Sequence, residues 1–595
     1  MKPRHFFLTL AVASAAALLT PGCSTMAPTH PTGSAPIDRH ALVTRHNPVL
    51  TQLDPSSPLS VGNGEFCFTV DVTGLQTFPE AYYGNTAIPL CTMADWGWHS
   101  FPNPNGYSMA TYNYKMYDSH GREVGYADQN SRDPASNYLR ENPHKFNLGQ
   151  IGFVLTKADG TPAQPSDLSD LKQTLDLWDG LLTSHFQFDG QPVDVQTICT
   201  PDHDMISVRV KSPLLGTGQI AVQLHFPYAS PGRDGSDWTK PDAHTTTLTP
   251  GAKGGTAILS RKLDDFTYNV VASWSDLGQE MKQTAPQQFE VTPQKGTTEF
   301  DFSCLFTPQK SLENLNGGDP LYDFAHFQSE TQQHWNNFWS TGGAIDLSLS
   351  KDPRWFELER RIVLSEYLTA IQSAGKNPPA ETGLTMNSWY GRFHMEMYWW
   401  HDAHFALWGR APLLENSLGF YQRALPDALA NAQRQGYAGA RWPKMSEPSG
   451  EDSPSSVGAF LIWQQPHPIY LAELDYRAHP NEATLEKYKD VIFATADFMA
   501  SFAWWDAANQ RYVLGPPLQA AQERFDKATM INPTYELTYW RWGLELAQQW
   551  RVRLGLPRNP KWADVLNKLS KPLVVDGKYA FTESTPDSYT NPKWD

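Results

Sequence analysis

The chain has 595 residues. A single hydrophobic core does not ordinarily include so many residues, so we expect at least two domains. Its net charge of -16 and isoelectric point near 5.6 argue against nucleic acid as a partner, because phosphate backbones are bound by clustered Lys and Arg. Aromatic residues make up 12% of the chain, with 21 Trp, which favours surfaces that stack on ligands. Large buried aromatic cores are the alternative.

Residues 1–36 have the layout of an export signal followed by a tether. Lys2 and Arg4 precede an apolar run over 6–19, which is too short to span a bilayer comfortably. Gly22-Cys23 after this run is similar to the end of a bacterial lipobox, and 25–36 is rich in Pro, Thr and Ser. We expect export to the periplasm and a lipid on Cys23 as the only membrane contact, anchored in the outer membrane. Cleavage by the ordinary signal peptidase is the alternative.

The region 37–347 has the pattern of a β-sandwich. Apolar residues alternate with small or polar ones over 66–72 and 220–226, as in strands with one buried face. Asp179-Gly180 and Asp189-Gly190 are hairpin-type turns on either side of 181–188. Many short strands without intervening helices predict an antiparallel sandwich.

From 348 to 595 the apolar period changes to that of helices. Asp352-Pro353 is a typical helix start, and Gly375 ends that helix before two prolines. The fold class expected is therefore a sandwich followed by an all-α domain. The further helices are predicted at 392–408, 413–434, 456–478, 483–504, 534–553 and 560–569.

No metal site and no cofactor are expected. Cys67, Cys91, Cys199 and Cys304 show no paired C-x-x-C spacing, and their disulfide pairing stays open. On a helix His394 and His401 would lie about 10 Å apart along the axis, too far to share an ion. His401 and His404 lack a third ligand at suitable spacing.

The stretch 387–467 combines indole rings with acids, amides and imidazoles, which is what a sugar site needs. On the helix predicted at 392–408, Glu396, Trp399 and Trp400 would share one face, so a carboxylate and an indole could hold a sugar together. At most one of the two indoles can point with Glu396 into a pocket, and the other should be core. The other predicted sugar contacts in this stretch are His401, Trp442, Lys444, Glu451, Gln464, Gln465 and His467. A solvated loop for Glu447 and Asp452, which flank Glu451, and an internal network for the two amides are the alternatives.

Glu523 is the candidate general acid. It follows Pro516-Pro517, which fixes the chain before Gln522-Glu523, so the carboxylate is presented from a loop. A loop acid beside aromatic helices can protonate a leaving group when burial raises its pKa. An exposed loop glutamate without a role is the alternative.

Three motifs resemble the six-hairpin glycosidases, most closely glycoside hydrolase family 65. Gly62-Asn63-Gly64 is similar to a sandwich signature of that clan, and 439–443 with 450–452 is similar to a Gly-Ala-Arg-Tyr-Pro-Trp run and its acidic sequel. The run from 514 to Glu523 stands where the family has Gly-Pro-Asp-Glu, with five more residues in between. The resemblance implies that Glu523 is the acid and that Glu396 with Trp399 lies in the reactive subsite. It also implies an (α/α) barrel of twelve helices, of which about half are recognisable here, so we expect a partial barrel whose catalytic base lies outside this chain.

The sequence thus predicts an exported glycoside hydrolase with an inverting, two-carboxylate mechanism and an oligosaccharide or glycoside as substrate. A phosphorylase, in which inorganic phosphate replaces the base, is one alternative. A carbohydrate-binding lipoprotein without turnover is the other. The sugar, its anomer and the oligomeric state stay open.

Overall fold

The computed structural model describes residues 36–251, 254–308 and 321–594. The chain divides into a short N-terminal segment, Met1–Asp38, and one compact unit, Arg39–Asp595. The predicted signal peptide, Cys23 and the tether up to residue 35 lie outside the described residues. None of the described helices is both long enough and apolar enough to cross a membrane.

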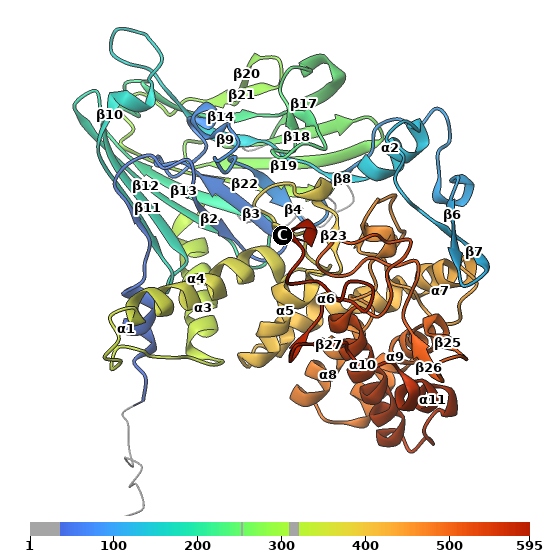
Figure 1. Ribbon diagram of the computed structural model, residues 1–595. Helices are drawn as coiled ribbons and strands as arrows, with labels where there is room; N and C mark the ends of the chain where they lie inside the picture. Colours follow the sequence, from blue (N-terminus) through green and yellow to red (C-terminus); the bar gives the residue numbers. More distant parts are fainter. Residues whose placement is uncertain (1–35, 252–253, 309–320, 595) are drawn as a thin grey trace, which may run out of the picture. The chain divides into compact units, whose positions relative to one another are not determined.

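A nine-stranded antiparallel sheet forms the larger layer of the first half, in the order β1-β10-β11-β12-β13-β22-β19-β18-β17 (Figure 1). β11 (Leu181–Phe188) covers the predicted strand, and along it half-buried and buried residues alternate because one face packs on the core. Asp189 and Gly190 both have positive φ, as a tight hairpin turn between β11 and β12 requires. The other bounds are β1 (Val49–Leu50), β10 (Leu168–Asp176), β12 (Gln191–Cys199), β13 (Met205–Lys211), β22 (Glu299–Pro308), β19 (Phe266–Trp274), β18 (Thr256–Leu263) and β17 (His244–Pro250).

Two smaller sheets, β20-β21-β14-β9 and β2-β3-β4, supply the other side of the core. Phe186 and Val208 of the large sheet belong to the same buried cluster as Val222 of β14 and Phe68 of β3. The predicted antiparallel sandwich is therefore confirmed. The bounds of the strands in these two sheets are β20 (Lys282–Ala285), β21 (Gln288–Val291), β14 (Ile220–His225), β9 (Gln150–Leu155), β2 (Leu59–Gly62), β3 (Phe66–Val70) and β4 (Thr92–Ala94). Two-stranded pairs are formed by β5 (Trp98–His99) with β8 (His144–Lys145), β6 (Lys115–Ser119) with β7 (Arg122–Tyr126), and β15 (Tyr228–Ala229) with β16 (Ser236–Asp237). Cys67, Cys91, Cys199 and Cys304 are buried and unpaired.

Helices interrupt the strand region, contrary to the prediction. α1 (Arg39–Thr44) opens it, α2 (Pro134–Glu141) lies between β7 and β8, and α3 (Phe324–Ser340) follows the last sandwich strand. α2 and α3 each begin after an aspartate, Asp133 and Asp323, whose side chain accepts a hydrogen bond from a first-turn amide. These are local caps that an alternating apolar pattern does not reveal.

The Gly62-Asn63-Gly64 turn docks the sandwich on helix α4 (Trp355–Ser373). The Gly64 amide donates to the Ile371 carbonyl at 3.0 Å. A Cβ on Gly62 would lie 2.8 Å from that same carbonyl oxygen, and Gly64 has a φ of +97°. Glycine is needed at both positions because the turn approaches the helix backbone so closely.

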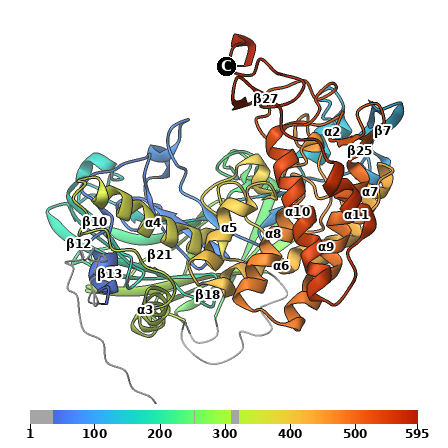
Figure 2. The ribbon, with the colours of Figure 1, turned by 60° about the horizontal axis from the view of Figure 1, so that its bottom comes forward.

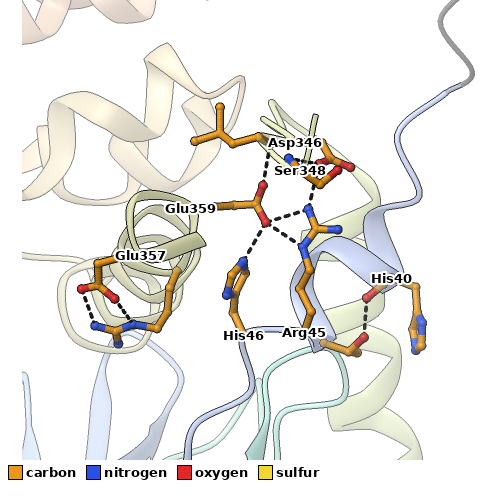
Figure 3. Close-up of polar contacts among 10 residues, drawn as sticks. His40, Arg45, His46, Asp346, Ser348, Glu357 and Glu359 are labelled. Carbon is orange, nitrogen blue, oxygen red and sulfur yellow. Dashed lines mark hydrogen bonds and ion pairs between the residues drawn. The ribbon is translucent and has the colours of Figure 1, made fainter. Parts of the chain in front are cut away.

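A buried carboxylate ties the start of the compact unit to α4 (Figure 3). Glu359 is fully buried and accepts hydrogen bonds from Arg45 Nε and from the Leu347 amide, at 2.7 and 2.6 Å. His46 Nε2 contacts the same carboxylate at 2.7 Å. Because a buried carboxylate is costly unless it is paired, this network fixes the linker before Trp355.

The second half is helical, and most helices that follow one another in the chain pack together. α9 contacts both α8 and α10, and Figure 2 shows these three side by side. The bounds are α5 (Tyr398–Leu407), α6 (Ala411–Arg423), α7 (Leu425–Arg434), α8 (His467–Ala478), α9 (Glu482–Phe502), α10 (Thr534–Arg553) and α11 (Pro560–Lys568); short strand pairs are β23 (Phe393–His394) with β24 (Met445–Ser446), β25 (Trp504–Asp506) with β26 (Arg511–Val513), and β27 (Val574–Val575) with β28 (Lys578–Tyr579).

Several predicted helix bounds are wrong for identifiable reasons. α4 begins at Trp355, two residues after Pro353. The helix predicted at 392–408 begins only at Tyr398, because 393–394 pairs with β24 instead. The one predicted at 413–434 is divided at Ala424, before a proline that cannot donate a helical hydrogen bond. The one predicted at 456–478 begins at His467.

Candidate functional site

Lys444 brings together the two acids that the sequence analysis singled out. Its ammonium group lies 3.0 Å from Glu396 Oε1 and 3.0 Å from Glu523 Oε1. The pairing of β23 with β24 creates this proximity, since the Met395 amide donates to the Lys444 carbonyl at 2.8 Å. A non-local strand pair, and not a shared helix face, therefore positions Glu396.

The electrostatics keep Glu396 ionised. Burial opposes its negative charge, but the hydrogen bond from His394 and the charge of Lys444 outweigh burial and lower the pKa of Glu396. Burial likewise works against the Lys444 cation, while Glu396 and Glu523 together raise the pKa of Lys444. Both partners thus favour the charged pair, in which one ammonium group serves two carboxylates.

A third carboxylate, Glu381, faces the same group of residues. His394 Nε2 lies 3.5 Å from Glu396 Oε1 and 3.7 Å from Glu381 Oε2. Ser388 donates a hydrogen bond to Glu381 Oε2 at 3.1 Å. Sequence reasoning did not select Glu381, because it lies in an irregular loop after α4 and no local pattern marks it.

Glu523 lies in a turn between β26 and α10, as predicted for a loop acid. The turn is closed by the Glu523 amide, which donates to the Ala520 carbonyl at 2.8 Å, and Glu523 has a φ of +57°. The Ala521 amide donates to Glu536 Oε1 at 2.7 Å, which anchors the turn to the first turn of α10. Burial raises the pKa of Glu536 to about 7. The side chain of Glu523 stays 39% exposed, so it is accessible to a ligand.

Exposed indole and phenol rings lie beside this cluster. Trp389 is 48% exposed, and the Lys444 ammonium lies 5.6 Å from its ring centroid. Trp400 is 54% exposed and meets Trp463 edge to face at 5.5 Å, while Trp463 meets the exposed Tyr535 at 5.9 Å. These rings offer the apolar faces that a pyranose stacks on. Trp389 was not among the predicted contacts.

Trp399 and Trp400 differ in environment. Trp399 is half-buried and packs on Tyr470 with ring centroids 5.9 Å apart. Trp400 is the exposed member of the pair. Of the two, Trp400 is therefore the one available for stacking.

His467 links the aromatic wall to Glu396. Its Nε2 lies 3.0 Å from the Glu396 carbonyl oxygen, its Nδ1 lies 2.9 Å from the Tyr539 hydroxyl, and its ring meets Trp463 at 5.4 Å. Burial lowers the pKa of His467 to about 4, so the ring is neutral. His467 positions the site without facing solvent.

The remaining predicted sugar contacts are either buried, bonded to backbone carbonyls, or exposed on a loop. Gln464 and Gln465 both donate to the Trp442 carbonyl, at 3.1 and 2.7 Å, and all three side chains are buried. These contacts are part of the internal network that was left open as an alternative, although Gln464 Oε1 has no hydrogen-bond partner among the described residues. The ring nitrogens of His401 face the carbonyls of Met397 and Glu381, at 2.8 and 3.0 Å. Glu451 is exposed on its loop.

No family model matches the chain, and no curated protein matches it. Among solved structures, a protein described as "Putative kojibiose phosphorylase from human microbiome" matches with a TM-score of 0.63 and 12% identity, over 91% of this chain and 72% of that one. A bacterial glucoamylase complexed with acarbose matches at 0.48 and 10% identity, over 87% of this chain and 66% of that one. A GH92 family glycosyl hydrolase matches at 0.40 and 11% identity, over 91% and 66%. The chain therefore has the fold predicted from its resemblance to the six-hairpin clan, a β-sandwich followed by an (α/α) helical region.

Proposed function

We propose that this chain is a glycoside hydrolase in which Glu523 is the general acid. The observation that carries the proposal is the convergence of Glu396 and Glu523 on Lys444, beside the exposed rings of Trp389 and Trp400. Carboxylates next to stacking rings supply the proton donor, the hydroxyl contacts and the negative field that glycoside cleavage requires.

Lys444 has to leave Glu523 before that acid can act. The Lys444 ammonium group contacts Glu523 Oε1 at 3.0 Å, whereas a general acid must present its carboxyl group to the leaving oxygen of the substrate. A sugar whose hydroxyls bond Glu396 and Lys444 competes for the ammonium group. Loss of the ion pair then frees the Glu523 carboxyl group to contact the glycosidic oxygen.

Glu396 serves substrate binding and not water activation in this proposal. The two Oε1 atoms of Glu396 and Glu523 cannot lie farther apart than their two 3.0 Å contacts to Lys444 placed end to end. An inverting pair is separated by roughly 6.5–9.5 Å to leave room for water. These two oxygens are thus closer than that separation of the carboxyl groups, and in this proposal a residue other than Glu396 activates the water.

The charge around the cluster favours hydrolysis over phosphorolysis. Lys444 already faces the carboxylates of Glu396 and Glu523. His394 already faces those of Glu381 and Glu396. A phosphate pocket needs cations free to bind the anion. The export signal predicted in 1–36 supports the same choice, since a sugar phosphate made outside the cytoplasm would be lost.

The test uses the full chain, natural disaccharides of glucose, fucose and rhamnose, and Glu523→Gln with Glu486→Gln as the control. Glu486 is a surface acid that also accepts from a lysine, Lys489, at 2.5 Å. Gln cannot donate the proton, so we expect turnover to fall by roughly 10²–10⁴-fold in the first variant and to stay unchanged in the control. Turnover that requires phosphate would establish the phosphorylase instead. Sugar binding without any turnover by the wild-type chain would establish the non-catalytic alternative.

A further inference from the structure

A second group of polar residues lies on the helices away from Lys444. Glu415 of α6, Asp475 of α8 and His479 at the end of α8 each offer one ligand atom, and these atoms lie within 4.8 Å of one another. Asp475 and His479 are four residues apart, so they share a helix face. His479 Nε2 lies 2.8 Å from Glu415 Oε1. Sequence reasoning missed this group because Glu415 comes from a different helix.

Asp475 gives independent evidence that the group binds a cation. Only 2% of Asp475 is exposed, and its Oδ1 has no hydrogen-bond partner. Its Oδ2 accepts from the Tyr488 hydroxyl at 2.5 Å, which fixes the carboxylate. A buried carboxylate oxygen without a partner costs free energy, and a metal ion removes that cost. Tyr488 then acts as the outer group that orients a metal ligand.

One cation faces this group from outside. Lys487 Nζ lies 3.6 Å from Asp475 Oδ2, on the oxygen that Tyr488 also contacts. The Lys487 side chain is 45% exposed and can turn toward water. The carboxylates of Glu415 and Asp475 outnumber this lysine, and Asp475 Oδ1 has no hydrogen-bond partner among the described residues.

We propose that Glu415, Asp475 and His479 bind a divalent transition-metal ion such as zinc. One imidazole nitrogen and two carboxylate oxygens are ligands that zinc accepts at about 2.0–2.2 Å, with water completing a tetrahedron. Such bond lengths need ligand atoms roughly 3–4 Å apart, and the 2.8 Å pair of His479 and Glu415 is already close to that range. The ion would join α6 to the end of α8.

The test uses the full chain without a histidine tag, stripped with EDTA and titrated with zinc chloride. We expect one zinc ion per chain by calorimetry and elemental analysis, and a higher melting temperature with zinc than with EDTA. His479→Ala and Glu415→Gln should each weaken zinc binding at least 10-fold and remove the melting shift. Both side chains are partly exposed, at 48% and 29%, so both variants should fold.

The matched control is His185→Ala. His185 is also a partly exposed histidine paired with a carboxylate, Asp194, at 2.7 Å, but it lies in the sandwich without a third ligand. It should keep the zinc response of the wild-type chain. The proposal is overturned if the wild-type chain shows no zinc-dependent shift, or if His479→Ala keeps the same affinity for zinc.

Discussion

Replacing Glu536 by Gln should change how stability depends on pH. Glu536 is fully buried, accepts one hydrogen bond from the Ala521 amide and has no partner at Oε2. Burial raises its pKa from 4.5 to about 7, which corresponds to about 3 kcal/mol between the two protonation states. Gln imitates the protonated acid in shape and charge but cannot ionise.

The sign follows from proton binding. Between pH 4.5 and 7 the folded chain keeps the Glu536 proton while the unfolded chain has lost it, so stability falls as pH rises and levels off above 7. The Gln variant lacks this fall. Its stability relative to the wild-type chain should therefore rise by about 2–3 kcal/mol from pH 5 to pH 8.

Urea unfolding at both pH values measures this difference. Other buried acids whose pKa is raised, such as Asp71 and Asp204, are present in both chains and cancel. Glu545→Gln is the control on the same helix, because the ion pair with Arg558 lowers the pKa of Glu545 below this range. A stability difference that is the same at pH 5 and pH 8 would refute the assignment of a buried, titrating Glu536.

Two further predictions compare neighbouring residues. Trp400→Ala should weaken sugar binding by roughly 1–3 kcal/mol with little change in melting temperature, because the exposed ring is lost. Trp399→Ala should instead lower stability by about 3 kcal/mol, because its ring packs on Tyr470, and sugar titrations with thermal melts separate the two effects. Glu359→Gln should lower the free energy of unfolding by roughly 3–5 kcal/mol, because it breaks a buried ion pair (Figure 3). Glu357 lies on the same helix but faces solvent, so Glu357→Gln should leave the melting temperature unchanged.

The sequence predicts those elements whose signals are local. α10 has the predicted bounds, Thr534–Arg553, and α9 and α11 differ from theirs by one or two residues at an end. β11 coincides with its predicted run because turn residues delimit it on both sides. The helix predicted over 392–408 fails over its first six residues, where Phe393 and His394 pair instead with a strand more than forty positions away. A periodicity argument contains no information about such a partner.

The same limit applies to the candidate site. Glu396, Lys444 and Glu523 could be named from the chemistry of their surroundings in the sequence. The sequence does not show that the Lys444 ammonium group contacts both carboxylates. The sequence indicates that Gln464 and Gln465 need partners, and only the fold shows that their side-chain nitrogens donate to a backbone carbonyl. A polar residue in an apolar run predicts a bonded group, and its partner depends on tertiary contacts.

Backbone conformation gives an independent reason to place function at the Lys444 cluster. Non-glycine residues with positive φ are mostly short or polar, and several lie at hairpin turns, where that conformation costs little. Trp389 and Tyr390 are bulky, yet have φ values of 51° and 67°. Left-handed backbone at such residues costs of order 1–3 kcal/mol each and persists only when the surrounding structure imposes it. Trp389 lies over the Lys444 ammonium, and Glu523, also left-handed, bonds that same group. Strain and paired charge therefore coincide at Lys444, which is the combination expected where a fold gives up stability to hold groups ready for a ligand.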